Sequence, residues 1–115
     1  MLALKSVLGN VDRVGTVVFD EIDAGIGGRV AEVVGRKLGE IGGERQVLCI
    51  THLPQIAARA SDHFVVRKKE SDGHTVVETE KLKGKNRIEE LARMLAGEDI
   101  TPTALKHAES LLKED

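Results

Sequence analysis

The chain has 115 residues, a formal net charge of −2 and 31% charged residues. This length corresponds to a single domain and is short for a complete nucleotide-hydrolysing protein. Aromatic residues make up only 2% of the chain, which argues against recognition of single-stranded nucleic acid by base stacking. The balanced charge gives no indication of a nucleic-acid or anionic-membrane surface.

Other compositional features predict a cytoplasmic protein without a membrane partner. Cys49 is the only cysteine, so the chain can form no intrachain disulfide, which fits a reducing compartment. No apolar run approaches the ~20 residues of a membrane-spanning helix. The N-terminal residues also lack the layout of a signal peptide.

The first predicted elements are a short helix and a buried strand. Residues 2–8 have apolar side chains at helical spacing, and Gly9 follows as a stop signal. No capping residue precedes this helix, so we expect Met1 to mark a cut and not a natural start. Residues 14–19 are almost continuously apolar or β-branched, which is typical of a strand buried on both faces.

A helix and a second strand follow. Residues 29–41 have apolar side chains three and four positions apart and charged side chains elsewhere, which predicts an amphipathic helix. Residues 46–50 predict another buried strand, and Pro54 begins a short helix through about Arg59. The order strand, helix, strand indicates a right-handed crossover between parallel strands.

The rest of the chain predicts a β-hairpin and two helices. The expected elements are hairpin strands at 64–66 and 75–77, a helix at 87–96 and a terminal helix at 101–112. The pair Asp72-Gly73 between the β-rich runs is a strong hairpin signal. Thr101 before Pro102 predicts an N-cap followed by a proline in the first helical turn.

Two carboxylates, Asp20 and Glu21, stand directly after the first strand. In a parallel α/β sheet, ligands bind beyond the carboxyl ends of the strands. Asp20 could hold a hydrated Mg²⁺, and Glu21 could deprotonate a water that attacks a phosphoryl group. This arrangement is typical of a Walker B motif with its adjacent base. The alternative is that both residues only mark the point where the chain leaves the core.

The second strand also ends in polar residues, at Thr51 and His52. Because the carboxyl ends of parallel strands meet at one edge, we expect His52 to lie near Asp20. An imidazole there could contact a terminal phosphate. For His52 alone, a surface histidine is the alternative, but the coincidence of two polar strand ends favours a site.

The glycine-rich stretch at 25–28 (GIGG) allows positive φ and close approach of the backbone. It does not match the dinucleotide fingerprint G-x-G-x-x-G, because Val30 stands at the last position. The phosphate-binding loop G-x-x-x-x-G-K-[ST] has no match in the sequence, since residues 84–86 read GKN. The sequence therefore predicts the metal and water side of a phosphoryl-transfer site without a phosphate cradle.

Two further groups are weaker candidates. One contains the metal-ligating residue types Cys49, His52, His63 and His74. Their spacing matches no recognised zinc pattern. The other is a basic cluster of Lys81, Lys83, Lys85 and Arg87. It could touch phosphates, but a solvated hairpin edge protected by lysine is the favoured interpretation.

Three runs of the sequence resemble the RecN family of bacterial DNA repair proteins, which belongs to the SMC-like ABC ATPases. The runs are 17–28 (VVFDEIDAGIGG), 50–58 (ITHLPQIAA) and 90–97 (ELARMLAG). The resemblance covers the whole chain. It implies an α/β fold that forms the C-terminal part of a P-loop NTPase head of the ABC/SMC type. This part would have parallel strands with flanking helices, a β-hairpin and C-terminal helices.

The resemblance divides one partial domain, residues 1–115, into three parts. Residues 1–60 would form the core with the Walker B motif, the D-loop and the switch histidine. Residues 61–82 would form the β-hairpin, and residues 83–115 the C-terminal helices. The Walker A loop, the signature motif and the coiled coil would lie upstream of Met1.

By this resemblance, Asp20 matches the Walker B aspartate that holds Mg²⁺ through water, Glu21 the catalytic glutamate and His52 the γ-phosphate sensor. The D-loop, which contacts the opposite subunit, is matched by Gly25, Ile26, Gly27 and Gly28. Gly27 stands where many ABC proteins have Asp, which leaves a backbone role for this loop.

The implied function is ATP-dependent repair and recombination at DNA double-strand breaks, carried out by the full-length protein with ATP and Mg²⁺ as cofactors. The implied partners are a second head in a head-to-head homodimer and DNA, and the implied location is the bacterial nucleoid. Without Walker A and signature motifs, the chain alone is predicted to be inactive as an ATPase. Two alternatives remain open. They are a self-standing metal-dependent phosphohydrolase or nuclease using Asp20, Glu21, Asp23 and His52, and a non-catalytic interaction module.

Overall fold

The computed structural model describes residues 15–20, 25 and 27–113. The predicted helix at 2–8 lies outside the described residues, as do Glu21, Asp23 and Ile26. In the described part of the chain, no helix is long and apolar enough to cross a membrane.

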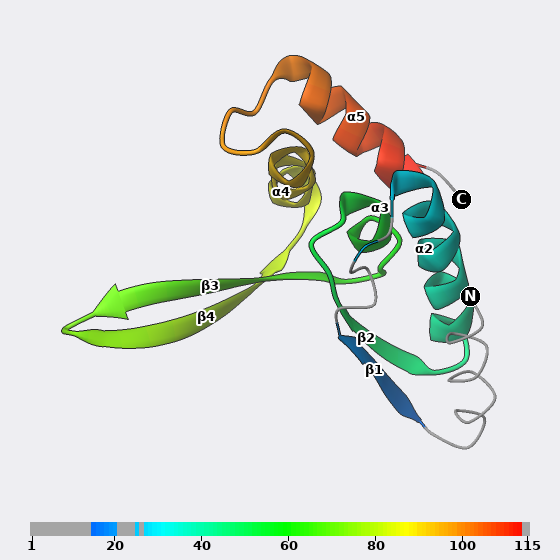
Figure 1. The fold of residues 1–115 in the computed structure, drawn as a ribbon, viewed down its shortest axis with the longest axis horizontal. Helices are drawn as coiled ribbons and strands as arrows, with labels where there is room; N and C mark the ends of the chain where they lie inside the picture. The colour runs from blue at the N-terminus through cyan, green and yellow to red at the C-terminus, as the bar shows by residue number, and fades with distance from the viewer. Residues whose placement is uncertain (1–14, 21–24, 26, 114–115) are drawn as a thin grey trace.

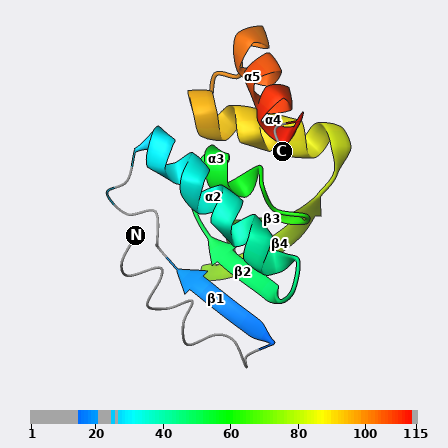
Figure 2. The ribbon, with the colours of Figure 1, turned by 90° about the vertical axis from the view of Figure 1, so that its right-hand side faces the viewer.

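A strand–helix–strand unit forms the first half of the fold. Strands β1 (Thr16–Asp20) and β2 (Gln46–Ile50) pair in parallel, and helix α2 (Gly28–Gly42) connects them (Figures 1 and 2). This confirms the crossover and the parallel pairing that the sequence predicts. Strand β2 has the predicted bounds, and α2 is one residue longer than predicted at each end.

Helix α2 covers one face of this two-stranded sheet. Val17 and Phe19 of β1 are buried against Ala31, Val34 and Leu38 of α2. On the opposite face, apolar side chains are exposed, at Val18 (60%), Leu48 (49%) and Ile50 (59%). The expectation of strands buried on both faces is therefore wrong for this chain, because no described element covers the second face.

A short helix and a long hairpin follow. Helix α3 (Pro54–Ala57) ends two residues before the predicted end. Strands β3 (His63–Ser71) and β4 (His74–Leu82) pair antiparallel and project from the body as an arm (Figure 1). The arm turns at Asp72 and Gly73, with φ values of 49° and 77°, the two positive values that a type I′ turn requires. The predicted hairpin is thus confirmed, with strands longer than predicted.

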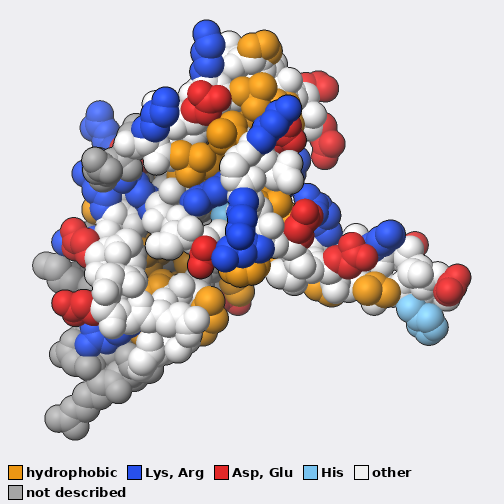
Figure 3. Space-filling model, turned by 180° about the vertical axis from the view of Figure 1, so that it is seen from behind, with side chains coloured by type: hydrophobic (Ala, Val, Ile, Leu, Met, Phe, Trp, Pro, Cys, Tyr) orange, Lys and Arg blue, Asp and Glu red, His pale blue; other side chains and the backbone are white. Residues whose placement is uncertain are grey.

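The two faces of the arm differ. At its base, His63 and Leu82 are paired and buried. Because side chains alternate along a strand, the opposite face carries Phe64, Val66 and Val77, which are all more than half exposed. Figure 3 shows hydrophobic side chains along the arm, between charged ones.

Helices α4 (Gly84–Ala96) and α5 (Pro102–Lys113) pack together as the C-terminal layer (Figure 2). Their shared core contains Leu91, Ala92 and Ala108, and it includes Ala57 and Ala58 from the α3 region. The Thr101 hydroxyl accepts a hydrogen bond from the Ala104 amide at 3.1 Å, which confirms the predicted N-cap of α5.

Helices α2 and α3 approach closely at Gly35. A Cβ atom at this position would lie 3.0 Å from the Gln55 carbonyl oxygen and 3.5 Å from the Ile56 Cα. The glycine therefore permits the contact between the two helices, because any side chain would push the α3 backbone away.

We predict that Gly35→Ala lowers the free energy of unfolding by about 1–3 kcal/mol, since the methyl group overpacks a backbone contact. Gly39→Ala is the matched control on the same helix, because its Cβ would meet no atom within 4 Å. It should raise stability by about 0.5–1 kcal/mol through helix propensity. Urea denaturation followed by circular dichroism measures both, and equal effects would contradict the close contact.

We also predict that the isolated chain self-associates through the exposed face of β1 and β2. The double variant Val18→Thr with Leu48→Thr should shift the association to higher protein concentration, because it removes apolar surface and keeps β propensity. Sedimentation velocity over a concentration series measures the effect. A monomeric wild-type chain at all concentrations would refute the prediction.

Candidate functional site

The carboxyl ends of β1 and β2 lie at the same edge of the sheet. The parallel register pairs Asp20 with Ile50, and His52 follows two residues after Ile50. Both Asp20 and His52 are exposed. The prediction that the two polar strand ends share one edge is therefore confirmed, and it places a carboxylate and an imidazole at the position where α/β proteins bind ligands.

The segment that carries His52 is a tight connection from strand to helix. The Thr51 hydroxyl accepts a hydrogen bond from the Leu53 amide at 3.0 Å. The Leu53 carbonyl accepts hydrogen bonds from the Ile56 and Ala57 amides, both at 3.1 Å, so α3 starts at once. Because turn and helix follow each other without a spacer, the position of His52 depends on the position of α3.

The glycine-rich stretch leads into α2 beside the same region. Gly25 has a φ of +75°, as its residue type allows. The Gly27 carbonyl accepts a hydrogen bond from the Ala31 amide at 2.9 Å and so begins the helix. A Cβ at Gly28 would lie 3.6 Å from the Gln55 side-chain nitrogen, which places the start of α2 next to α3. Glu21 and Ile26, which belong to the same predicted site, lie outside the described residues.

In the described part of the chain, the other metal-ligating residue types lie far apart along the fold. Within residues 15–20, 25 and 27–113, no group of three or more His, Cys, Asp or Glu side chains could hold a metal ion. Cys49 lies in β2, His63 at the base of the arm and His74 at its tip. Asp20 supplies one exposed carboxylate, a donor set that fits a hydrated Mg²⁺ and not a zinc ion.

One member of the basic cluster has a role that sequence reasoning missed. The Arg87 guanidinium donates hydrogen bonds to the carbonyls of Ala60 at 2.7 Å and of Ala57 and Ala58 at 3.3 Å. Lys81 forms an ion pair with Asp62 at 3.2 Å, as expected for an exposed hairpin edge. The solvated-edge interpretation is therefore wrong for Arg87. No sequence pattern marks this contact, because its acceptors are backbone carbonyls.

A buried histidine lies beside Arg87. His63 is 8% exposed, and its Nδ1 atom is buried without a hydrogen-bond partner. Burial and the nearby Arg87 cation lower the pKa of His63, while Glu90 opposes this shift. The pKa of Glu90 is lowered mainly by hydrogen bonds from Arg93. The base of the arm thus places His63 near Arg87 and Glu90 of α4, where burial and the Arg87 cation disfavour its protonation.

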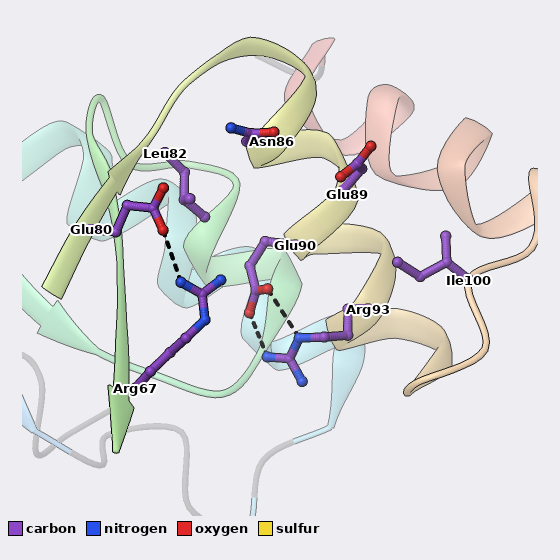
Figure 4. A pocket seen from close by; sticks show the side chains of 8 residues that line it. All are labelled: Arg67, Glu80, Leu82, Asn86, Glu89, Glu90, Arg93 and Ile100. Carbon is purple, nitrogen blue, oxygen red and sulfur yellow. Dashed lines mark hydrogen bonds and ion pairs between the residues drawn. The ribbon is translucent and has the colours of Figure 1, made fainter. Parts of the chain in front are cut away.

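A cavity of about 320 Å³ opens between the base of the arm and α4. Figure 4 shows two pairs among its charged side chains, Arg67 with Glu80 and Arg93 with Glu90, while Glu89 also lines the cavity. The Arg67–Glu80 contact is 2.8 Å long and links the two strands of the arm. One pair lies within the arm and the other within α4, and the cavity has no excess of positive charge for an anion.

We predict that acidification from pH 7.5 to 5.5 lowers the stability of the fold through His63. Because the folded-state pKa lies below the ordinary 6.5, the unfolded chain binds the proton more readily, and stability is lost as pH falls through this range. Glu90 contributes only below its ordinary value of 4.5, outside the tested window. His63→Gln should flatten the dependence measured by thermal unfolding, and His107→Gln, at an exposed position, should not. Equal profiles for both variants would contradict the assignment.

The fold has a clear structural relative. A solved structure concerned with ATP-driven dimerization and DNA-stimulated activation of SMC ATPases superposes with a TM-score of 0.64 and 20% identity. The superposition covers 85% of this chain and 58% of that chain. The chain therefore has the fold of part of an SMC-type ATPase head.

Comparison of the amino-acid sequence identifies more specific relatives than the fold does, although no protein-family model matches the chain. DNA repair protein RecN is 50% identical over 113 residues in Treponema pallidum, 50% over 112 in Deinococcus radiodurans and 40% over 114 in Bacillus subtilis. These alignments cover 97–99% of this chain and 19–20% of the relatives. The chain belongs to the RecN family, and it spans about one fifth of the length of the curated relatives it matches.

Proposed function

We propose that this chain supplies the hydrolytic side of a composite ATP site in a RecN protein that repairs DNA. The observation that carries the proposal is the shared edge of β1 and β2, where Asp20 and His52 stand at neighbouring strand ends. Membership of the RecN family and the SMC-type fold support it. Since the chain is about one fifth of its relatives, the phosphate cradle would come from the rest of the protein.

Each residue at this edge has a distinct proposed role. Asp20 holds the hydrated Mg²⁺, which when bound would neutralise charge on the phosphates. Glu21, which follows Asp20 in the sequence, accepts a proton from the attacking water as a general base. His52 donates a hydrogen bond to the terminal phosphate and so reports its presence. Residues 24–28 present backbone groups to a second head in a homodimer.

The test is the ATPase activity of the full-length RecN protein that contains this segment. Glu21→Gln should retain ATP binding and lose about 10²- to 10⁴-fold in kcat, because the amide cannot accept the proton. Asp20→Asn should also lower kcat and should shift the Mg²⁺ concentration needed for activity upward. Steady-state hydrolysis and equilibrium binding of labelled ATP separate the two effects.

Two controls make this test decisive. Glu44→Gln alters an exposed carboxylate after α2, away from the carboxyl edge, and should leave kcat unchanged. The isolated 115-residue chain should show no turnover, since its sequence has no phosphate-binding loop. Full activity of Glu21→Gln would refute the proposed base. Mg²⁺- or Mn²⁺-dependent cleavage of phosphate esters by the isolated chain would favour the self-standing phosphohydrolase instead.

A further inference from the structure

Arg87 joins the C-terminal helices to the end of α3. Its guanidinium nitrogen Nη2 lies 2.7 Å from the Ala60 carbonyl oxygen and 3.3 Å from those of Ala57 and Ala58. The side chain is partly buried, and its Nε atom is fully enclosed. An arginine on α4 therefore fills the space beyond the last turn of α3.

The three acceptors lie at and just beyond the C-terminal end of α3, since Ala57 is its last residue, Ala58 is its C-cap and Ala60 follows two residues later. The last carbonyls of a helix have no partner within it, and the helix dipole favours a cation there. Helix α3 has only four residues, too few to be stable without contacts from its neighbours. The hydrogen bonds from Arg87 therefore fix the end of α3 in position.

The other side of α3 is fixed by α2. The close approach at Gly35 places the α2 backbone against the Gln55 carbonyl and Ile56. Helix α3 is thus held between α2 on one side and Arg87 of α4 on the other. Since His52 lies two residues before α3, within the turn that Thr51 closes, a shift of α3 moves His52 along the edge that also holds Asp20.

We propose that Arg87 is a positioning residue for ATP hydrolysis, because it holds His52 in place through α3. The proposal rests on the proposed role of His52 at the terminal phosphate. It makes the C-terminal helices, which contact α3, part of the hydrolytic machinery. A purely structural clip between α3 and α4 is the competing explanation, and it predicts lower stability with unchanged turnover in the folded protein.

The experiment compares Arg87→Ala, Arg87→Lys and Lys85→Ala in the full-length RecN protein. Arg87→Ala should lower kcat for ATP on the order of tenfold to a hundredfold, as expected for a displaced catalytic group, with the KM for ATP changed less than about twofold. Arg87→Lys keeps the charge and one hydrogen-bonding nitrogen, so it should recover part of kcat. Lys85 is exposed on the same helix, and its replacement should leave both constants unchanged.

A double-mutant cycle with His52→Ala separates this proposal from the proposed function. If Arg87 acts through His52, the double variant should hydrolyse ATP no more slowly than His52→Ala alone. Additive losses, or an unchanged kcat in Arg87→Ala despite a lowered melting temperature, would overturn the positioning role. An unchanged kcat in His52→Ala would instead overturn the proposed role of His52. If Arg87→Ala does not fold, Arg87→Lys and its double variant provide the same comparison.

Discussion

The position of the four-residue helix α3 is the constraint on which the rest of the structure depends. Its residues belong to both apolar cores, since Ile56 packs with β1 and α2, and Ala57 packs with α4 and α5. A helix this short forms only where neighbours hold it, so the glycine at position 35 and the cation at position 87 are both needed. The strand–helix–strand unit and the C-terminal layer are therefore coupled through one helical turn.

This coupling relates the fold to the chemistry proposed for the sheet edge. The β1–β2 edge orders Asp20 by backbone pairing, which is rigid, whereas His52 stands on a connection whose geometry α3 decides. A displacement of α3 would therefore change the position of His52 relative to Asp20, and α3 is in contact with the C-terminal helices.

Local patterns predicted much of the fold. The apolar runs located β1 and β2, the helical spacing of apolar residues located α2, and the turn chemistry located the arm and the cap at Thr101. The shared edge of Asp20 and His52 followed from the parallel pairing. The exposed face that carries Val18 was not predicted. An apolar run indicates that a strand is buried, but it does not show whether the same chain covers it. The contacts of Arg87 were missed because their acceptors, the backbone carbonyls of Ala57, Ala58 and Ala60, leave no pattern in the sequence.

The turn at Asp72 and Gly73 fixes the register between the two strands of the arm, which the apolar residues alone would leave ambiguous. Each strand of the arm carries two adjacent valines, at 65 and 66 and at 76 and 77. Because adjacent side chains point to opposite faces, a shift of the strand register by one residue would still place a valine of each strand on each face. A slip would reverse the faces of β4 relative to β3 and would separate Leu82 from His63. The two positive φ values at the tip select one register, because they fix which residues form the turn. A constraint at the far end of the arm thus selects which side chains reach α4 at its base.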